Sequence, residues 1–298
     1  MLLERLLDNL ALDVEAFATC WVADGWRLRL PPADWVTLHF SVSGRGTVRG
    51  LRGRPFALSP GTLALIPPSC QHSLESGEPP YGETGPTGVA SGNALVCHLA
   101  GPEDEDGRLV VCGRISATSG GGIGLFDQLD DLLVLDFGGD DAMRSTFAAV
   151  RYEAESDRAG ARAMTSALMK GCLIRVLRRL CEDDRCAVPW LDALDDPTLA
   201  PVLEAMLDQP GEPHTVSSLA ARVFMSRSAF AKRFHDHFGQ PPIQYLRGIR
   251  LRYAARLLRK KPPLPISMVA HRSGFSSRSQ SSRAFSSHFG RPPSAFRA

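Results

Sequence analysis

Hydrophobic and polar positions alternate along the first part of the chain, as they do in strands. Apolar and polar side chains take turns from Trp35 to Val42, and turn-forming glycines follow at Gly44 and Gly46. Such alternation is typical of strands with one buried face. Further short strands are predicted at residues 47–51, 55–58, 63–66, 94–99 and 109–115. Many short strands joined by Gly and Pro turns predict a small antiparallel β-barrel.

Apolar residues in the rest of the chain mostly recur at every third or fourth position, the period of a helix with one buried face. Helices are predicted at residues 142–157, 161–182 and 197–207, after an apolar stretch of mixed spacing at 123–137. The helix at 161–182 has a broad apolar face, which would either pack against the barrel or form the surface of a homodimer. Strands followed by helices predict the α+β class.

One phrase of 17 residues occurs twice near the C-terminus, at Ser226–Pro242 and Ser277–Pro293, with nine identical positions. Each copy begins with a serine that can cap a helix and ends with a glycine and two prolines. A repeat with these start and stop signals predicts one helical unit in two copies. Short helices are predicted just before each copy, at 215–223 and 266–275, so both copies form helix-turn-helix units in an all-α C-terminal domain.

The segment at residues 241–260 predicts a single helix between the two units. Its length would be about 30 Å, close to the ~34 Å between successive major-groove segments on one face of DNA. One chain could therefore place two reading helices in adjacent turns without dimerising. A helix-turn-helix shape by itself would also suit an ordinary helical bundle.

If Phe230, Phe234 and Phe238 form the buried stripe of the first repeated helix, the residues that would reach base edges follow by position. They are Ser228, Ala229 and Lys232 in the first copy and Ser279, Gln280 and Arg283 in the second. The residues predicted to contact phosphates are Arg227, Arg278, Arg291 and Arg297.

Charge is divided unevenly along the chain. Residues 211–298 hold 16 Lys and Arg against two acidic residues, a net charge of +14, whereas residues 1–210 carry a net charge of −12. The basic segment predicts binding to a polyanion, with double-stranded DNA as the partner. Its periodic apolar residues distinguish it from a disordered basic arm. A non-specific nucleic-acid binder is the alternative, because charge alone supplies such binding.

The C-terminal motifs resemble those of the AraC/XylS family of bacterial transcription regulators. The resemblance covers about the last 90 residues and rests on Ser226–Phe234, Arg250–Leu258 and Gly274–Arg297. It implies DNA-binding control of transcription, usually with an N-terminal domain that senses a ligand or holds a dimer together. Ser281 stands where the family usually has an aromatic or aliphatic core residue. Because this stretch is also rich in serine, the second unit is predicted to be the less rigid one.

Residues 60–72 are similar to the second motif of cupin barrels, and His39 falls where the first motif would start. The combination resembles the AraC-family branch with an N-terminal cupin domain. Metal cupins use about three histidines and a carboxylate, whereas Ser41 occupies the second histidine position here. His39, His72 and His98 are thus candidates for an effector pocket or for a metal ion, and the alternative is that they are core histidines.

A metal-dependent cupin enzyme is the competing class of function, and the incomplete histidine set argues against it. The sequence lacks a P-loop, a His-Glu-x-x-His motif and a Ser/His/Asp pattern, so a non-enzyme without a cofactor is predicted.

The seven cysteines are odd in number and show no Cys-x-x-Cys spacing, which excludes a disulfide framework and a zinc finger. Cys20 and Cys112 are predicted to lie near the first and last strands. Some cupin-containing AraC-like regulators that respond to oxidants place cysteines in similar positions, so the resemblance implies a redox effector as one alternative to a small molecule. Buried cysteines that act as small hydrophobes are the other interpretation.

Three domains are predicted: a cupin-like sensory barrel at 1–120, a helical connector at 121–190 that could support a homodimer, and a DNA-binding domain at 191–298. Acidic residues interrupt the apolar N-terminal stretch, which is not typical of a signal peptide. No run of about 18 apolar residues is present, so no membrane span is predicted and the protein is expected to be cytoplasmic.

Overall fold

The computed structural model describes residues 7, 10–14, 17–33, 35–50, 54–68, 70–77, 80–86, 88–91, 95–102, 106–119, 123–126, 129, 131–155, 158–182, 191, 193, 196–259 and 264–297. Some limits predicted from the sequence fall outside these residues. They are the limits of two predicted strands, at Leu51 and Ala94, the ends of two predicted helices, at Asp157 and Lys260, and the predicted domain limits at 120, 121 and 190. The chain divides into two compact units. The sheet-rich unit contains residues 11–117 and 126–179, and the C-terminal or helical unit contains residues 1–10, 118–125 and 180–298.

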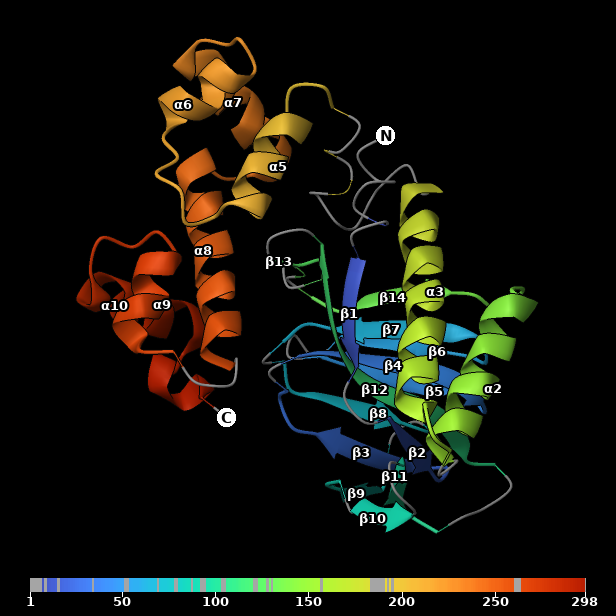
Figure 1. Ribbon diagram of the computed structural model, residues 1–298. Coiled ribbons are helices and arrows are strands. Elements are labelled where there is room, and N and C mark those ends of the chain that lie inside the picture. The colour runs from blue at the N-terminus through green and yellow to red at the C-terminus, as the bar shows by residue number, and fades with distance from the viewer. Residues whose placement is uncertain are drawn as a thin grey trace. The chain divides into compact units, whose positions relative to one another are not determined.

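The described strands form two sheets (Figure 1). The larger one contains β1 (Leu10–Val14), β2 (Ala18–Val22), β4 (Val36–Ser43), β7 (Thr62–Ile66), β10 (Gly88–Ser91), β11 (Leu95–Ala100), β12 (Arg108–Ser119), β13 (Ile123–Gly124) and β14 (Leu133–Asp136). The order along this sheet is β10-β11-β2-β12-β4-β7-β14, and β1 and β13 pair with β12 off this path. The smaller sheet, in the order β6-β5-β8-β3-β9, contains β3 (Trp26–Leu30), β5 (Gly46–Arg49), β6 (Pro55–Leu58), β8 (His72–Glu75) and β9 (Gly82–Thr84).

The α+β class with a sheet-rich N-terminal part is confirmed, but the strands differ from a simple antiparallel barrel in two respects. The described strands form two separate sheets with a shared apolar core, and two pairings, β2 with β11 and β3 with β9, are parallel. Alternation along a strand reports which side chains are buried. It does not report which strand lies next to it or in which direction that strand runs.

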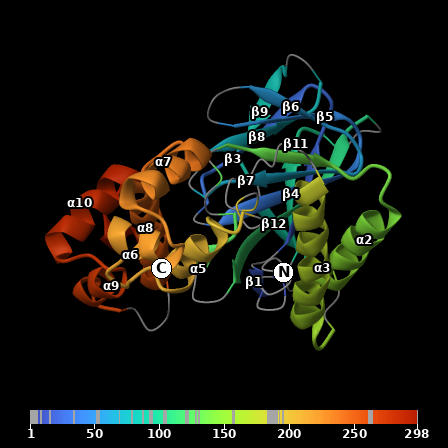
Figure 2. The same cartoon turned by 90° about the horizontal axis from the view of Figure 1, so that it is seen from above.

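The core between the sheets is made of small and medium apolar side chains, including Val22, Leu28, Val48, Ile66 and Leu74. Helices α2 (Asp141–Glu155) and α3 (Ala161–Glu182) lie side by side next to the larger sheet (Figures 1 and 2). The ring of Phe40 on β4 stacks on that of Phe147 on α2, with 4.0 Å between the centroids.

The apolar face of α3 is largely used within the chain itself. Its side chains from Met169 to Leu180 at helical spacing are buried, while Met164 remains 51% exposed. Of the two interpretations of this face, packing within the chain therefore accounts for most of its apolar residues.

The described residues from 196 to 297 form helices and the turns between them, as predicted. The helices are α5 (Ala200–Asp208), α6 (Val216–Arg222), α7 (Arg227–Phe238), α8 (Pro242–Arg259), α9 (Ile266–Arg272), α10 (Arg278–Phe289) and the 3₁₀ helix η1 (Pro293–Phe296). In Figure 1, α6 and α7 lie at one end of α8, and α9 and α10 lie at the other. No helix in the described part of the chain is long and apolar enough to cross a membrane.

The repeated helices α7 and α10 begin and end in the same way. The hydroxyl of Ser226 accepts the backbone N–H of Ala229 at 3.3 Å, and that of Ser277 accepts the N–H of Gln280 at 3.2 Å. Each helix ends at a glycine in the left-handed conformation, with φ of 68° at Gly239 and 70° at Gly290. A glycine adopts this conformation without a steric penalty, so both helices stop after 12 residues.

Candidate functional site

The six predicted base-reading residues are all exposed and lie in the first two turns of α7 and α10. In α7 the ammonium of Lys232 donates to the carboxylate of Asp236 at 2.6 Å. In α10 the side-chain carbonyl of Gln280 accepts a hydrogen bond from the hydroxyl of Ser276 at 2.7 Å. Both polar side chains are therefore held at the surface by local partners that solvent or a ligand can replace.

The four predicted phosphate contacts fall into two groups. Arg227 and Arg278 open α7 and α10 and are exposed. The guanidinium of Arg291 instead lies over the ring of Phe296, 4.0 Å from its centroid, and Arg297 donates to the carbonyl of Leu264 at 2.6 Å. The second pair thus contributes to packing at the C-terminus.

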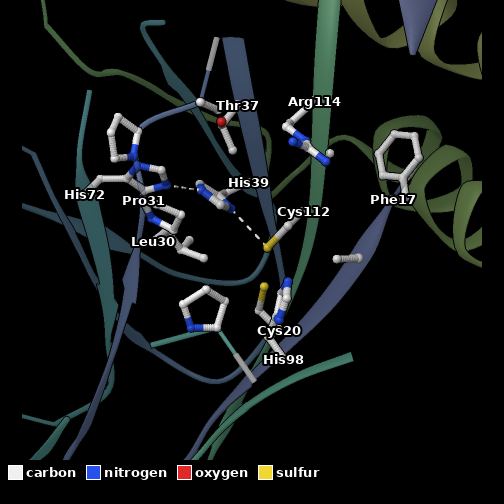
Figure 3. Close-up of a pocket in the computed structure, with 15 residues that line it drawn as sticks. Phe17, Cys20, Leu30, Pro31, Thr37, His39, His72, His98, Cys112 and Arg114 are labelled. Atoms are coloured by element: carbon white, nitrogen blue, oxygen red, sulfur yellow. Dashed lines mark hydrogen bonds between the residues drawn. The ribbon is translucent and has the colours of Figure 1, made fainter. Parts of the chain in front are cut away.

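A cavity of about 270 Å³ opens into the sheet-rich unit. It is lined by Phe17, Ala18, Cys20, Leu30, Pro31, Pro32, Ala33, Thr37, His39, His72, Pro86, His98, Cys112, Gly113 and Arg114. Figure 3 shows His39 between His72 and Cys112, and the sulfur of Cys20 next to that of Cys112. The structure thus brings all five predicted effector and redox residues to one cavity.

Strand register explains why these residues meet. On the larger sheet His98 pairs with Cys20, and His39 pairs with Cys112. Cys20 and Cys112 are diagonal neighbours, because Cys20 pairs with Val110, two residues before Cys112. These side chains share one face of four adjacent strands, and His72 reaches them from β8 on the smaller sheet.

The hydrogen bonds among these residues have a fixed direction. The carbonyl of Cys70 can only accept, so Nδ1 of His72, 3.2 Å away, carries a proton. A neutral imidazole carries a proton on only one nitrogen, so Nε2 of His72 is an acceptor. It accepts a hydrogen bond from Nε2 of His39 at 2.7 Å. Nδ1 of His39 therefore accepts the thiol proton of Cys112 at 3.0 Å. The Val110 carbonyl is a second, more distant acceptor for this thiol, at 3.8 Å.

Burial keeps this chain of groups neutral. Burial, together with the charges of His72 and Arg108, holds the pKa of His39 well below 6.5. Burial also lowers the pKa of His72 to about 4, against the effect of its hydrogen bond to Cys70. The pKa of the Cys112 thiol is raised well above 9.0 by burial and by the neighbouring Cys20. The resting pair of Cys112 and His39 is thus a thiol and a neutral imidazole.

The histidines do not fit a cupin metal centre. Two nitrogens bound to one ion at about 2.1 Å stand roughly 3.4 Å apart in tetrahedral geometry, whereas Nε2 of His39 and Nε2 of His72 are hydrogen-bonded at 2.7 Å. Within the described ranges, no group of three or more His, Cys, Asp or Glu side chains could hold a metal ion.

Arg108 is a buried charge that the sequence analysis missed. Its side chain is fully buried, and its Nη1 donates to the carbonyls of Glu75 at 2.9 Å and Thr47 at 3.3 Å. Burial lowers its pKa to about 10, although the neighbouring Cys112 and Cys20 act in the opposite direction. Its position at the start of the apolar run that contains Cys112 was the available signal. A lone arginine there is equally typical of a strand end in solvent.

Comparison with known proteins assigns each unit. Residues 2–182 match the cupin family model, and residues 219–298 match a helix-turn-helix domain model. The RCS-specific HTH-type transcriptional activator RclR of Escherichia coli K12 is 25% identical over 303 residues, covering 99% of this chain and 96% of its own. The transcriptional regulator AlkR of Acinetobacter baylyi is 41% identical over 108 residues, 36% of this chain and 35% of its own.

A third relative, named as an AraC-like transcription regulator, comes from Streptomyces lividans and is 38% identical over 126 residues, which cover 42% of this chain and 41% of that protein. The cupin match covers more than half of the chain, and the relatives with matching sequence are transcription regulators. The chain therefore belongs to the cupin family in its N-terminal part and is, as a whole, a DNA-binding transcription regulator of the AraC type.

Proposed function

We propose that the protein binds DNA sequence-specifically by placing α7 and α10 in successive major-groove segments. The observation that carries this proposal is the equivalence of the two helices, which have the same length, serine cap and left-handed glycine end. The 18-residue helix α8 between the units is about 27 Å long, of the order of one ~34 Å DNA repeat. Acting on DNA, the protein would work in the cytoplasm and need no catalytic step.

Each reading helix has its own chemistry. Lys232 and Arg283 can donate to guanine O6 and N7, Gln280 can bond adenine, and Ser228 and Ser279 can contact several bases. Ala229 can meet a thymine methyl group. Arg227 and Arg278, at the first residue of each helix, are placed for phosphates and would fix register without reading sequence.

Selection of bound DNA from a random pool tests this proposal. We expect one preferred site with two conserved blocks about 10 base pairs apart. Added salt will weaken the binding of the protein to both preferred and random DNA. A sequence-specific protein will still bind the preferred site more tightly than random DNA. Recovery of sequences without a shared motif would instead support the non-specific binder.

We further propose that the cavity makes DNA binding responsive to oxidation of Cys112 and Cys20. The sulfur of Cys20 lies next to that of Cys112 (Figure 3), and Nδ1 of His39 is placed to take the proton of Cys112 during reaction. A relative that aligns over nearly the whole chain is named an RCS-specific transcriptional activator. Because the resting thiol is neutral, a strongly electrophilic oxidant such as a hypohalous acid is favoured over a weak one.

The reaction balances as a two-electron oxidation. The sulfur of Cys112 takes the halogen from the hypohalous acid, and hydroxide leaves and is protonated to water by the former thiol proton. The sulfur of Cys20 then attacks that of Cys112, so an S–S bond forms, halide leaves and the proton of Cys20 is released. Two thiols and one hypohalous acid thus give one disulfide, water and hydrogen halide.

Intact mass and DNA affinity, measured before and after a stoichiometric amount of hypohalous acid, test the redox proposal. The wild-type protein should lose two hydrogens and change its affinity, whereas Cys20→Ser and Cys112→Ser should do neither. Cys181→Ser, an exposed cysteine on α3, serves as the matched control and should respond like wild type. An effector that binds the cavity reversibly would leave the mass unchanged and would not require Cys20.

A further inference from the structure

Phe224 has an unusual conformation in the turn of the first helix-turn-helix unit. Its φ is 54°, and among the described residues it is the one non-glycine with a positive φ. Its side chain is 99% exposed. A left-handed conformation is unfavourable for a bulky residue, and an exposed aromatic ring gains nothing from burial. Neither the backbone nor the packing of the unit therefore accounts for a phenylalanine here.

The second unit shows which residue the turn itself requires. There the equivalent position is Gly274, with a φ of 73°. The backbone hydrogen bonds of the two turns establish this equivalence. In each turn, the N–H of the residue after the left-handed position donates to the carbonyl of an alanine five residues earlier. Met225 donates to Ala220 and Phe275 to Ala270, both at 3.0 Å. Glycine adopts this conformation freely, so the first unit carries a strained aromatic residue where glycine would be more stable.

The surroundings of Phe224 indicate its partner. It lies two residues before Ser226, the cap of α7, and the exposed run from Ser226 to Ala229 follows it. Exposed Arg222 and Arg227 flank it on either side in the sequence. An apolar ring between two cations matches the surface of DNA, where apolar thymine methyl groups and deoxyribose rings alternate with phosphates.

We propose that Phe224 contacts DNA directly, with its ring against the apolar surface of a nucleotide next to the bases read by α7. The inference rests on the proposed mode of DNA binding and adds a specificity-determining residue to it. A thymine methyl group and a deoxyribose present the same apolar chemistry. The methyl group alone would also make the contact sequence-dependent.

Phe224→Gly and Phe224→Asn in the full chain test the proposal. Glycine removes the strain and asparagine tolerates the left-handed conformation, so both variants should melt at the same temperature as wild type or higher. Both should bind the preferred DNA about 5- to 10-fold more weakly, the lower end of the loss caused by one mismatched base pair. Tyr152→Ala removes another exposed aromatic ring, from α2, and should leave affinity unchanged.

Duplexes with deoxyuridine in place of each thymine identify the contacted group. If one replacement weakens DNA binding by the wild-type protein but not by Phe224→Gly, the ring contacts the methyl group of that thymine. If no replacement weakens binding by the wild-type protein while Phe224→Gly still binds weakly, the ring contacts a deoxyribose. If both variants bind the preferred DNA with wild-type affinity, the inference is wrong, even if they no longer regulate transcription. In that case a loss in Lys232→Ala would leave the proposed function intact, whereas absence of any preferred site would remove it.

Discussion

Ser281 occupies in α10 the position that Phe230 occupies in α7, and both side chains are buried, with exposed fractions of 3% and 0%. Their backbone N–H groups make equivalent bonds to the capping serines, at 3.1 Å from Ser281 to Ser277 and 3.0 Å from Phe230 to Ser226. The two helices thus have the same backbone, but the second buries a much smaller and polar side chain at this position.

We expect amide hydrogens of residues 278–288 to exchange faster than those of residues 227–237. The serine-rich α10 has low helix propensity and loses the apolar contacts that Phe230 makes in α7. Hydrogen exchange followed by mass spectrometry measures this directly. Ser281→Ala should slow exchange in α10, since alanine has the higher propensity by about 0.5 kcal/mol, and equal protection of the two wild-type helices would contradict the prediction.

Lys232→Ala and Arg283→Ala should each weaken binding to the preferred site by about 1–3 kcal/mol and relax base choice at one position. The reason is that each side chain is exposed on its reading helix and can make specific bonds to a base. Fluorescence anisotropy with matched and single-substituted duplexes gives both quantities. Arg178→Ala, which removes one exposed charge from α3, is the control, and an equal loss on random DNA would make Lys232 or Arg283 a phosphate contact.

The stability of the sheet-rich unit should fall as the pH drops from about 6.5 to 4. The pKa of His72 is lowered to about 4 by burial, so in this window the unfolded chain takes up a proton that the folded chain does not. The full effect is on the order of 3 kcal/mol. Urea denaturation at a series of pH values should show a flatter dependence for His72→Gln, while His235→Gln, on the exposed side of α7, should keep the wild-type slope.

Asp196 ties the start of the helical unit to α7. Its Oδ1 accepts the N–H groups of Thr198 at 2.7 Å and Leu199 at 3.1 Å, and its Oδ2 accepts from Arg233 at 2.8 Å. Asp196→Ala should cost about 1–3 kcal/mol, because the N–H groups of Thr198 and Leu199 lose their charged acceptor. Arg233→Ala should cost less, about 0.2–1 kcal/mol, because that guanidinium is 48% exposed. Urea denaturation would rank the two, and the reverse order would show that the ion pair dominates.

The helices of the C-terminal unit could be predicted because their boundaries depend on local chemistry. Thr215, Ser226 and Ser277 cap helices in the structure, and Gly239 and Gly290 end them. Each of these signals acts through neighbours in the sequence, so one chain was sufficient to find them.

The sheets could be predicted only in part. Strands such as Val36–Ser43 and Pro55–Leu58 were found, but His72–Glu75 is buried at all four positions and has no alternation to detect. The sequence named His39, His72, Cys20 and Cys112 as candidates. Their hydrogen-bonded chain, and the buried guanidinium of Arg108, depend on register between strands that are far apart in the sequence.

The uninterrupted helix α8 also restricts how a target sequence can vary. One residue inserted in a helix advances it by 1.5 Å and turns it by about 100°, whereas one extra base pair advances DNA by about 3.4 Å and turns it by roughly 35°. No small insertion in either molecule matches both the distance and the angular phase of an insertion in the other. On the proposed mode of binding, α8 thus acts as a ruler of fixed length and phase, and the spacing between half-sites should be invariant across promoters even where their base sequences diverge.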